Sequence, residues 1–511
     1  MKQWTGGYVA DIDYTHGYYR ELNPLHAAMA LAHAGLAMPA VGAACELGFG
    51  QGLSVNLHAA AGSARWHGTD FNPTQAGFAA QLAQAAGSGA LLLDQSFSEY
   101  CQRDDLPDFD FIGLHGVWSW VSGDNRRQLL AFIQRKLKPG GVLYVSHNSH
   151  PGWAPMAPLR DLLAQYIDSM TAPGDGMERR IDAALAFAGR LLATNPAYLQ
   201  AYPLLAERIA ALQTQDRRYL AHEYFNQHWQ PLRFADMAAQ LAQADVDIGC
   251  PAHHLDQIAL FNLDAAQRAL LADLPDPALA EGVRDLMVNQ SFRRDYWVKG
   301  ARQLSAVQQE QAMARQRVVL VAPRSEAELH VKTSMLDITL NTALYGPLLD
   351  LLADHQPRSV AELAAALPMR GGLQQVFEAV FILCGNGTLA PAATPEACAA
   401  AREPARRLNL ALLERARYSE AINYLASPVV GGGLPMPRIP QLFLLAQSQG
   451  RRGTEAWSAF TWDVLAAQGQ QLSKNGQLLT SAADNLAELQ RKADIFERQY
   501  LPMYRTLRVA D

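Results

Sequence analysis

Strand-like and helix-like patterns alternate from about residue 41 to residue 147, and this feature limits the possible folds more than any other. Five short apolar runs typical of strands recur along this stretch, and segments with helical spacing lie between them. The runs are VGAACEL (41–47), ARWHGTD (64–70), GALLLDQS (89–96), FDFIGLH (109–115) and GVLYVSH (141–147). This order predicts an α/β fold with a doubly wound parallel sheet and helices on both faces.

The predicted sheet continues after a helical stretch. Helical spacing dominates residues 155–220, a strand pattern follows at 218–226, and a helix leads from there to a second strand pattern at 245–250. We interpret 155–220 as a helical insertion before the last strands of the same sheet, so that residues 1–260 form one domain. The alternative is a separate domain over 155–260.

The rest of the chain is predicted to be mainly helical. We assign residues 261–330 to a helical linking or regulatory region and 401–511 to a C-terminal helical region. The last forty residues are expected to form a long amphipathic helix, a candidate contact for a homodimer or another domain. Residues 331–400 show three helices followed by a short strand, which is typical of a winged helix.

The winged-helix-like module is not predicted to bind nucleic acid. Its third helix, 372–384, contains no Lys or Arg, whereas recognition helices need basic side chains for phosphate contacts. The whole chain has 43 basic and 49 acidic residues, a net charge of −6, which gives no affinity for polyanions. A role in packing against protein is favoured.

The sequence favours a cytoplasmic protein without a membrane span. The N-terminal stretch lacks the apolar core of a signal peptide, and no uninterrupted apolar run approaches about 18 residues. The five cysteines are scattered and form no CxxC pair, which argues against a disulfide framework and a structural zinc site.

The stretch ACELGFGQGLS (44–54) carries three glycines at alternate positions behind the first strand pattern. A dinucleotide fingerprint needs Gly or Ala at the sixth position of its motif, where Leu53 or Val55 stands here. A phosphate-binding P-loop needs a lysine at its end, and none follows. The loop therefore suits neither NAD nor ATP.

The acid before the glycines indicates a different cofactor. Glu46 lies two residues before Gly48, and Gly50 and Gly52 let the backbone pass close to a ligand. A carboxylate at a strand end can accept a hydrogen bond from a ligand ammonium group. S-adenosylmethionine (SAM), which carries an amino-acid moiety and no phosphate, fits this pattern.

Two further strand patterns also end in an acid. Asp70 closes the second pattern, where a carboxylate can bind both ribose hydroxyls. The third ends in residues expected near the adenine: Asp94, Gln95, Ser96 and Phe97. The alternative is that Glu46, Asp70 and Asp94 are only solvated strand ends. The candidate cofactor contacts also include Tyr14, Phe71 and His115.

The segments ELGFGQG, GTD, LLLDQS, DFIGLHGVWSWV and LKPGGVLYVS resemble those of class I SAM-dependent methyltransferases. The resemblance implies SAM binding and a seven-stranded sheet whose last strand is antiparallel. The flanking segments GYVADIDYTHGYYRELNP, SHNSHPGW, AHEYFN and SFRRDYWVKG are similar to bacterial methyltransferases with a regulatory domain, among them rickettsial protein lysine methyltransferases. His147 stands where many relatives have an aromatic residue before the asparagine, which leaves Asn148 as the better-matched position.

Candidate catalytic residues follow the fourth and fifth strand patterns. His115 and Trp118 could form the walls of an acceptor pocket, with Trp120 as a weaker candidate, although tryptophans often pack as core. Asn148 could offer its amide oxygen to an acceptor amine. Aromatic faces also attract a sulfonium or a methylated amine.

Tyrosines before the first strand pattern could fold over the cofactor as a lid. They are Tyr8, Tyr14, Tyr18 and Tyr19, and Tyr18 is the catalytic candidate among them. The alternative is that they fasten the N-terminus to the core. His222 and its neighbours Glu223 and Tyr224 are further candidates for the same pocket.

No metal site is expected. His147, His150 and His222 lack the carboxylate and histidine spacing of ligands on a helix. SFRRDYWVKG (291–300) is interpreted as Arg–Asp pairing inside a helical interface, in preference to a docking site for an acidic partner.

The sequence thus predicts a methyltransferase that acts on a protein side chain, most simply the ε-amine of lysine. The large extra modules favour a protein acceptor over a small molecule. The alternatives are a small-molecule methyltransferase and a non-catalytic SAM-binding scaffold.

Overall fold

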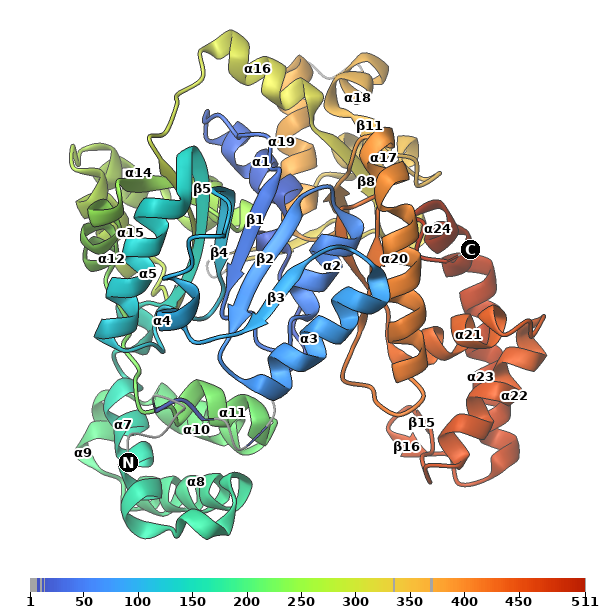
Figure 1. Cartoon of the computed structure of the whole chain (residues 1–511), viewed down its shortest axis with the longest axis horizontal. Helices are drawn as coiled ribbons and strands as arrows, with labels where there is room; N and C mark the ends of the chain where they lie inside the picture. Colours follow the sequence, from blue (N-terminus) through green and yellow to red (C-terminus); the bar gives the residue numbers. More distant parts are fainter. Residues whose placement is uncertain (1–6, 10–11, 13, 334–335, 368–370, 511) are drawn as a thin grey trace.

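A computed structural model describes residues 7–9, 12, 14–333, 336–367 and 371–510. Its centre is a seven-stranded sheet in the order β3-β2-β1-β4-β5-β7-β6 (Figure 1). The strands are β1 (Ala43–Leu47), β2 (Arg65–Asp70), β3 (Leu91–Asp94), β4 (Phe109–Leu114), β5 (Leu137–Asn148), β6 (Val246–Pro251) and β7 (Phe292–Lys299). The five predicted strands between residues 41 and 147 are confirmed.

One strand runs against its neighbours. β1 to β5 are parallel to one another, whereas β7 is antiparallel to both β5 and β6. The carboxyl ends of β1 to β5 therefore meet at one edge of the sheet, which is where ligands bind in open α/β folds. The predicted seven-stranded sheet with one antiparallel strand is confirmed.

The strand predicted at 218–226 is wrong. These residues lie in and just after helix α11 (Arg217–Tyr224), which begins at Asp216, whose side chain accepts from the backbone N–H of Arg218 and Tyr219. Its buried residues are Leu220, Ala221, His222 and Tyr224, and the apolar ones among them follow helical spacing. The aromatic residues concealed that spacing because they suggest a strand.

The seventh strand lies instead at 292–299, where a helical interface was predicted. The side chains of this strand alternate between the two faces of the sheet, and both faces are mostly buried. The arginines can lie there because they are paired with carboxylates. The alternation of apolar and polar residues typical of a strand is not visible in the sequence here, because charged residues occupy buried positions. The Arg–Asp pairing itself is present, and the sheet extends past the predicted domain boundary at residue 260.

Helices cover both faces of the sheet. The face with Trp66, Phe111 and Tyr144 packs against α1 (Pro24–His33), α2 (Leu53–Ala61) and α3 (Pro73–Ala86). The opposite face packs against α4 (Phe97–Tyr100), α5 (Gly123–Lys136) and α12 (Phe234–Leu241). The sheet that carries the site is therefore covered by helices on both faces.

The segment between β5 and β6 contains a helical subdomain. Its helices are α6 (His150–Trp153), α7 (Ala157–Met170), α8 (Met177–Ala193), α9 (Ala197–Ala201), α10 (Leu204–Gln213) and α11. They enclose a core of their own and lie below the sheet in Figure 1. After β6, helices α13 (Ala259–Asn262), α14 (Ala265–Ala272) and α15 (Pro277–Met287) lead to β7.

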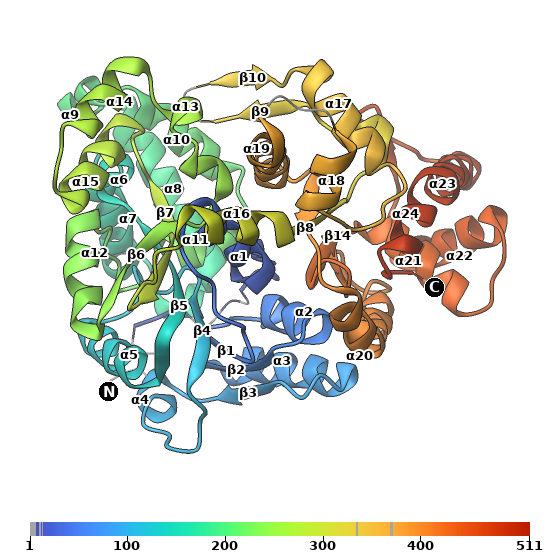
Figure 2. The same ribbon diagram turned by 90° about the horizontal axis from the view of Figure 1, so that it is seen from above.

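A smaller module follows, linked by α16 (Ala306–Arg315). It contains the predicted helices α17 (Thr342–Leu351), α18 (Val360–Ala366) and α19 (Gly372–Gly385), the hairpin β9 (His330–Lys332) and β10 (Asp337–Thr339), and a sheet of β8 (Arg317–Leu320), β11 (Arg358–Ser359) and β12 (Leu389–Pro391). Ser359 and Glu362 form the predicted capping box. The central strand β8 precedes residue 331, and the winged-helix assignment stays a prediction. Helix α1 lies between the large sheet and α19 (Figure 2).

The C-terminal region packs against α2 and α3. It consists of α20 (Pro395–Arg415), the hairpin β13 (Tyr424–Ser427) and β14 (Gly432–Pro435), α21 (Arg438–Ser448), α22 (Thr454–Ala466), the short hairpin β15 (Ser473–Lys474) and β16 (Gln477–Leu478), α23 (Ala482–Ile495) and α24 (Leu501–Thr506). The long terminal helix is interrupted by a π-helical turn over Phe496–Tyr500. None of the helices in the described ranges has the length and apolar character needed to span a bilayer.

Candidate active site

The glycine loop at the end of β1 closes over the sheet edge. Gly48, Gly50 and Gly52 have φ angles of +75°, +57° and +67°, which other residues rarely adopt. A Cβ on Gly48 would lie 2.7 Å from the Val117 side chain, and one on Gly52 would lie 2.4 Å from Cβ of Ala79. Gly48 and Gly50 therefore face the cavity, whereas Gly52 allows α2 to pack on α3.

Asp70 is oriented by the backbone around it. Its Oδ2 accepts from N–H of Gly50 at 2.8 Å, and its Oδ1 accepts from N–H of Asn72 at 3.0 Å. Burial raises the pKa of Asp70 to about 6, although these two hydrogen bonds favour the carboxylate. Each oxygen keeps a second lone pair, so this carboxylate can accept from two ligand hydroxyls.

A small cavity lies over the loop. Its lining residues are Tyr8, Tyr14, Gly48, Gly50, Asp70, Phe71, Gln75, Gln95, Phe97, His115, Gly116, Val117, Trp120 and Val121. They combine aromatic and aliphatic walls with a few polar groups, which is the composition of sites for nucleoside-like ligands. Its volume is about 90 Å³, because Tyr14 lies against Gly50 and the Tyr8 ring lies edge-on to Phe71. Asp70 and the aromatic rings of this lining suit the ribose and adenine of SAM in their chemistry.

Glu46 is buried at the end of β1, behind the loop. Only 2% of its surface is exposed, and within the described part of the chain its Oε2 has no hydrogen-bond partner. Burial, with a smaller contribution from Asp70, raises the pKa of Glu46 to about 8. Glu46 is not among the residues that line the cavity, so its contact with the ammonium group of SAM stays a prediction. A cation placed close to it would favour the ionised carboxylate.

The affinity for SAM is therefore expected to rise between pH 6 and pH 8. A cation in the cavity favours ionised Glu46, and the ligand-free protein loses this proton only near pH 8, so binding at lower pH must release it. Calorimetric titrations in two buffers with different ionisation enthalpies measure that proton release. Glu46→Gln should flatten the pH dependence; an equal slope in this variant would remove Glu46 as its cause.

The residues predicted near the adenine are divided between two roles. Gln95 and Phe97 line the cavity. Asp94 is exposed beside Asp70 in the neighbouring strand, and Ser96 uses its hydroxyl to cap α4 in a capping box with Glu99. Neither side chain lines the cavity, so the contact of Asp94 and Ser96 with the adenine stays a prediction.

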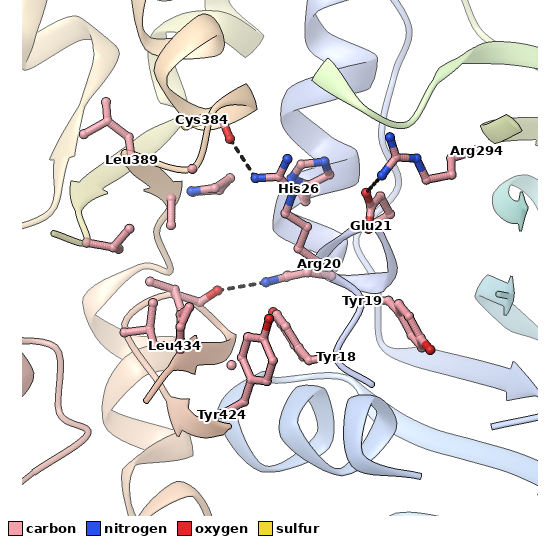
Figure 3. Close-up of a pocket in the computed structure, with 18 of the residues that line it drawn as sticks. Tyr18, Tyr19, Arg20, Glu21, His26, Arg294, Cys384, Leu389, Tyr424 and Leu434 are labelled. Atoms are coloured by element: carbon pink, nitrogen blue, oxygen red, sulfur yellow. Dashed lines mark hydrogen bonds and ion pairs between the residues drawn. The ribbon is translucent and has the colours of Figure 1, made fainter. Parts of the chain in front are cut away.

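His115 is placed at the end of β4, where its ring borders the cofactor cavity. Its Nδ1 lies 2.8 Å from the Tyr144 hydroxyl, and burial lowers its pKa to about 4, so the imidazole is neutral. The Tyr19 ring stacks on it with centroids 3.5 Å apart. Tyr18 and Tyr19 line a second cavity of about 540 Å³, which shares His115 with the first (Figure 3).

Two predicted catalytic residues lie elsewhere. Trp118 is fully buried in the core beneath α5 and α12, and its indole donates to Gln240, so it is not a pocket wall. Asn148 lines neither cavity. Its backbone N–H donates to Ser119, and its Nδ2 is buried with no partner among the described residues. Trp120, the weaker candidate, does line the cofactor cavity.

Gln75 and Val117 also line the small cavity, and neither was predicted from the sequence. Gln75 is a buried polar side chain in the first turn of α3, immediately after Asp70 and its capping residue Asn72. The cap and Pro73 place the helix start at this edge, which would have identified Gln75 as a neighbour of the cofactor. No comparable signal marks Val117.

Asp70→Ala is expected to weaken SAM binding by about 30-fold or more, because hydrogen bonds to a charged acceptor contribute about 1.5–3 kcal/mol each. Asp70→Asn is the matched control, since its amide oxygen can still accept from one of the two backbone N–H groups that position the loop. Titration calorimetry measures both. Wild-type affinity in Asp70→Ala would contradict the ribose assignment.

Comparison with known proteins identifies two domains. A methyltransferase domain model matches residues 45–145, and the model of a predicted methyltransferase regulatory domain matches residues 216–299. An uncharacterized protein of Synechocystis sp., sll1526, is 34% identical over 513 residues, which cover 99% of this chain and 100% of that protein. An uncharacterized protein of Rickettsia prowazekii, RP789, is 29% identical over 32% of this chain and 30% of its own length.

Among solved structures, PKMT2 from Rickettsia typhi in complex with AdoHcy has the same fold. The similarity covers 97% of this chain and 99% of that one, with a TM-score of 0.67 and 17% sequence identity. The arrangement of sheet, helical subdomain and C-terminal modules is therefore shared along the full length.

Proposed function

Because the chain belongs to the family of class I SAM-dependent methyltransferases that carry a methyltransferase regulatory domain, we propose that it methylates a protein, at the ε-amine of lysine. The observation that carries this proposal is the position of neutral His115 between the cofactor cavity and a second, larger cavity. The resemblance to rickettsial protein lysine methyltransferases and the fold shared with PKMT2 support it.

The residues for holding SAM follow from the site. Asp70 would accept from the ribose hydroxyls, Phe71 and Phe97 would face the adenine, and buried Glu46 would favour the ammonium end. When bound, SAM supplies a methyl group on a positively charged sulfur, which is transferred in line to a nucleophile. Tyr8 and Tyr14 would close over the cofactor and exclude water.

The acceptor amine must lose a proton before it can accept the methyl group. A dry, aromatic pocket favours the neutral form of a lysine amine because burial disfavours the charged form. We place the ring proton of His115 on Nδ1, donated to Tyr144, so that Nε2 accepts a hydrogen bond from the amine. This bond would aim the nitrogen lone pair at the methyl group.

Labelled SAM incubated with the protein and with lysate of its source cells tests the proposal. After separation of macromolecules from small molecules, the label is expected in protein, and acid hydrolysis should release it as methyl-lysine. Label in the small-molecule fraction would indicate a metabolite acceptor instead. SAM binding without any transfer would favour a non-catalytic scaffold.

A further inference from the structure

We propose that the second cavity receives the acceptor lysine together with part of its peptide, and that the C-terminal region forms one of its walls. This inference rests on the proposed function and deepens it by assigning the acceptor site. The cavity lies between the sheet edge, the smaller module and the hairpin of β13 and β14 (Figure 3).

The cavity has the size of a substrate site. Its volume of about 540 Å³ lies within the range of about 300–1,000 Å³ typical of ligand pockets. A lysine side chain alone would leave much of it empty, so the space suits a lysine with neighbouring residues. Its walls include Tyr18, Tyr19, Glu21, His115, Phe292, Arg294, Ala390, Tyr424 and Leu434.

Only a thin aromatic layer separates this cavity from the cofactor cavity. Tyr19 stacks on His115 with an angle of 18° between the rings, and its hydroxyl is hydrogen-bonded to that of Tyr14. Tyr14 lines the cofactor cavity, Tyr19 lines the second one, and His115 lines both. An amine that displaces the Tyr19 ring from His115 would therefore reach the cofactor side.

The chemistry of the walls suits a neutral amine with an apolar stem. Glu21 is buried and pairs with Arg294 at 2.8 Å. Burial opposes ionisation of Glu21, but Arg294 and Arg20 lower its pKa, so the carboxylate is charged. Arg20 donates to the carbonyls of Cys384 and Gly385 at the end of α19.

Glu21 thus neutralises Arg294, and backbone carbonyls satisfy the N–H groups of Arg20. The positive charge of Arg20 disfavours a protonated amine, and the aromatic faces remain available to the neutral one. Tyr18, Tyr19, Phe292 and Tyr424 supply such faces. The aliphatic part of the wall, with Leu434, suits the methylene chain of lysine.

The C-terminal hairpin is fitted closely to the tyrosine segment. Tyr18 packs on Tyr424 with ring centroids 5.0 Å apart. A Cβ on Gly432 would lie 2.4 Å from the Tyr18 hydroxyl, and one on Gly433 would lie 3.1 Å from its ring. Glycine at both positions lets the hairpin approach, so the acceptor site is incomplete without this region.

Ala390→Trp tests the assignment because Ala390 is half-buried in β12 and its enlargement fills the cavity without removing a core side chain. Val321→Phe fills the same cavity with a smaller increase in side-chain volume, and it replaces Ala390→Trp if that variant is unstable. The matched control is Ala466→Trp, an exposed position in α22. Melting temperature and SAM affinity should be close to wild type in all three.

Two readouts are compared. The first is binding of Nα-acetyl-lysine methylamide to protein saturated with S-adenosylhomocysteine, measured by calorimetry against the norleucine analogue. The second is transfer of labelled methyl to lysate protein. Both are expected to fall about tenfold or more in the cavity-filling variants, since a filled pocket cannot enclose the ligand, and to persist in the control.

The outcomes separate this inference from the proposed function. Equal methylation of protein by wild type and the filled variants would overturn the acceptor site while the function stands. Failure of wild type to bind the lysine probe would also overturn it. Probe binding that the filled variants abolish, without label in any protein, would support the cavity and reject protein methylation.

Discussion

Replacing His115 by alanine is expected to lower the rate of methyl transfer by about 100-fold or more, with SAM affinity within about threefold of wild type. The expected loss is this large because small errors in the position of a nucleophile cost about that factor. His115 borders both cavities and is neutral, so its removal affects the aim of the amine more than the charge around the cofactor. Single-turnover measurements with saturating SAM give the rate of the transfer step.

Two further variants test how His115 acts. Tyr144→Phe removes the hydroxyl 2.8 Å from Nδ1 and should reproduce part of the loss without touching either ligand. His115→Asn keeps a hydrogen-bond acceptor and should recover part of the rate. If His115→Ala lowers SAM affinity and leaves the transfer rate unchanged, the histidine belongs to the cofactor site alone.

The sequence was sufficient to predict most of the residues that line the small cavity because they are local. The glycine loop and Asp70 stand at the ends of consecutive parallel strands, and the order of those strands brings their carboxyl ends together. Gln95, Phe97 and His115 follow from the same rule. Asp94 also lies at the end of a parallel strand, but its side chain is exposed. The sequence pattern places the residue at the sheet edge and does not show the direction of its side chain.

The second cavity could not be predicted in this way. Its walls combine Tyr19 with Phe292 and Tyr424, residues far apart in the chain that only tertiary packing brings together. Trp118 shows the opposite error: it stands beside His115 in the sequence, yet the loop turns its indole into the core toward Gln240. Adjacency to a functional residue is a weak guide where the chain leaves a strand.

The seventh strand was not predicted because it carries buried charged residues, and this charge cluster contributes measurably to stability. Arg293 is buried and contacts three carboxylates: Asp285 at 2.6 Å, Asp295 at 2.8 Å and Glu281 at 2.8 Å. Its guanidinium also lies over the Phe234 ring, 4.4 Å from the centroid. In the sequence, so many charges suggest pairing inside a helical interface, whereas here they fill the space between β7 and its covering helices.

Arg293→Met is therefore expected to lower the free energy of unfolding by about 3–5 kcal/mol, because it leaves buried carboxylates without their counter-charge. Burial already raises the pKa of Asp285 to about 6 with the arginine in place. Without the arginine, that pKa should rise further, and a raised folded-state pKa makes an acid more destabilising as pH increases above its unfolded value. The loss measured by urea unfolding should thus be larger at pH 8 than at pH 5.

A compensated variant distinguishes charge from packing. Arg293→Met combined with Asp285→Asn and Asp295→Asn removes the two fully buried charges, leaves the partly exposed Glu281, and should recover part of the stability at pH 8. If the triple variant is no more stable than Arg293→Met, the lost contact with Phe234 accounts for the effect instead. The opposite face of β7 carries Phe292 and Arg294, which line the second cavity. Arg293→Met should therefore also weaken binding of the lysine probe, and the triple variant should restore part of it.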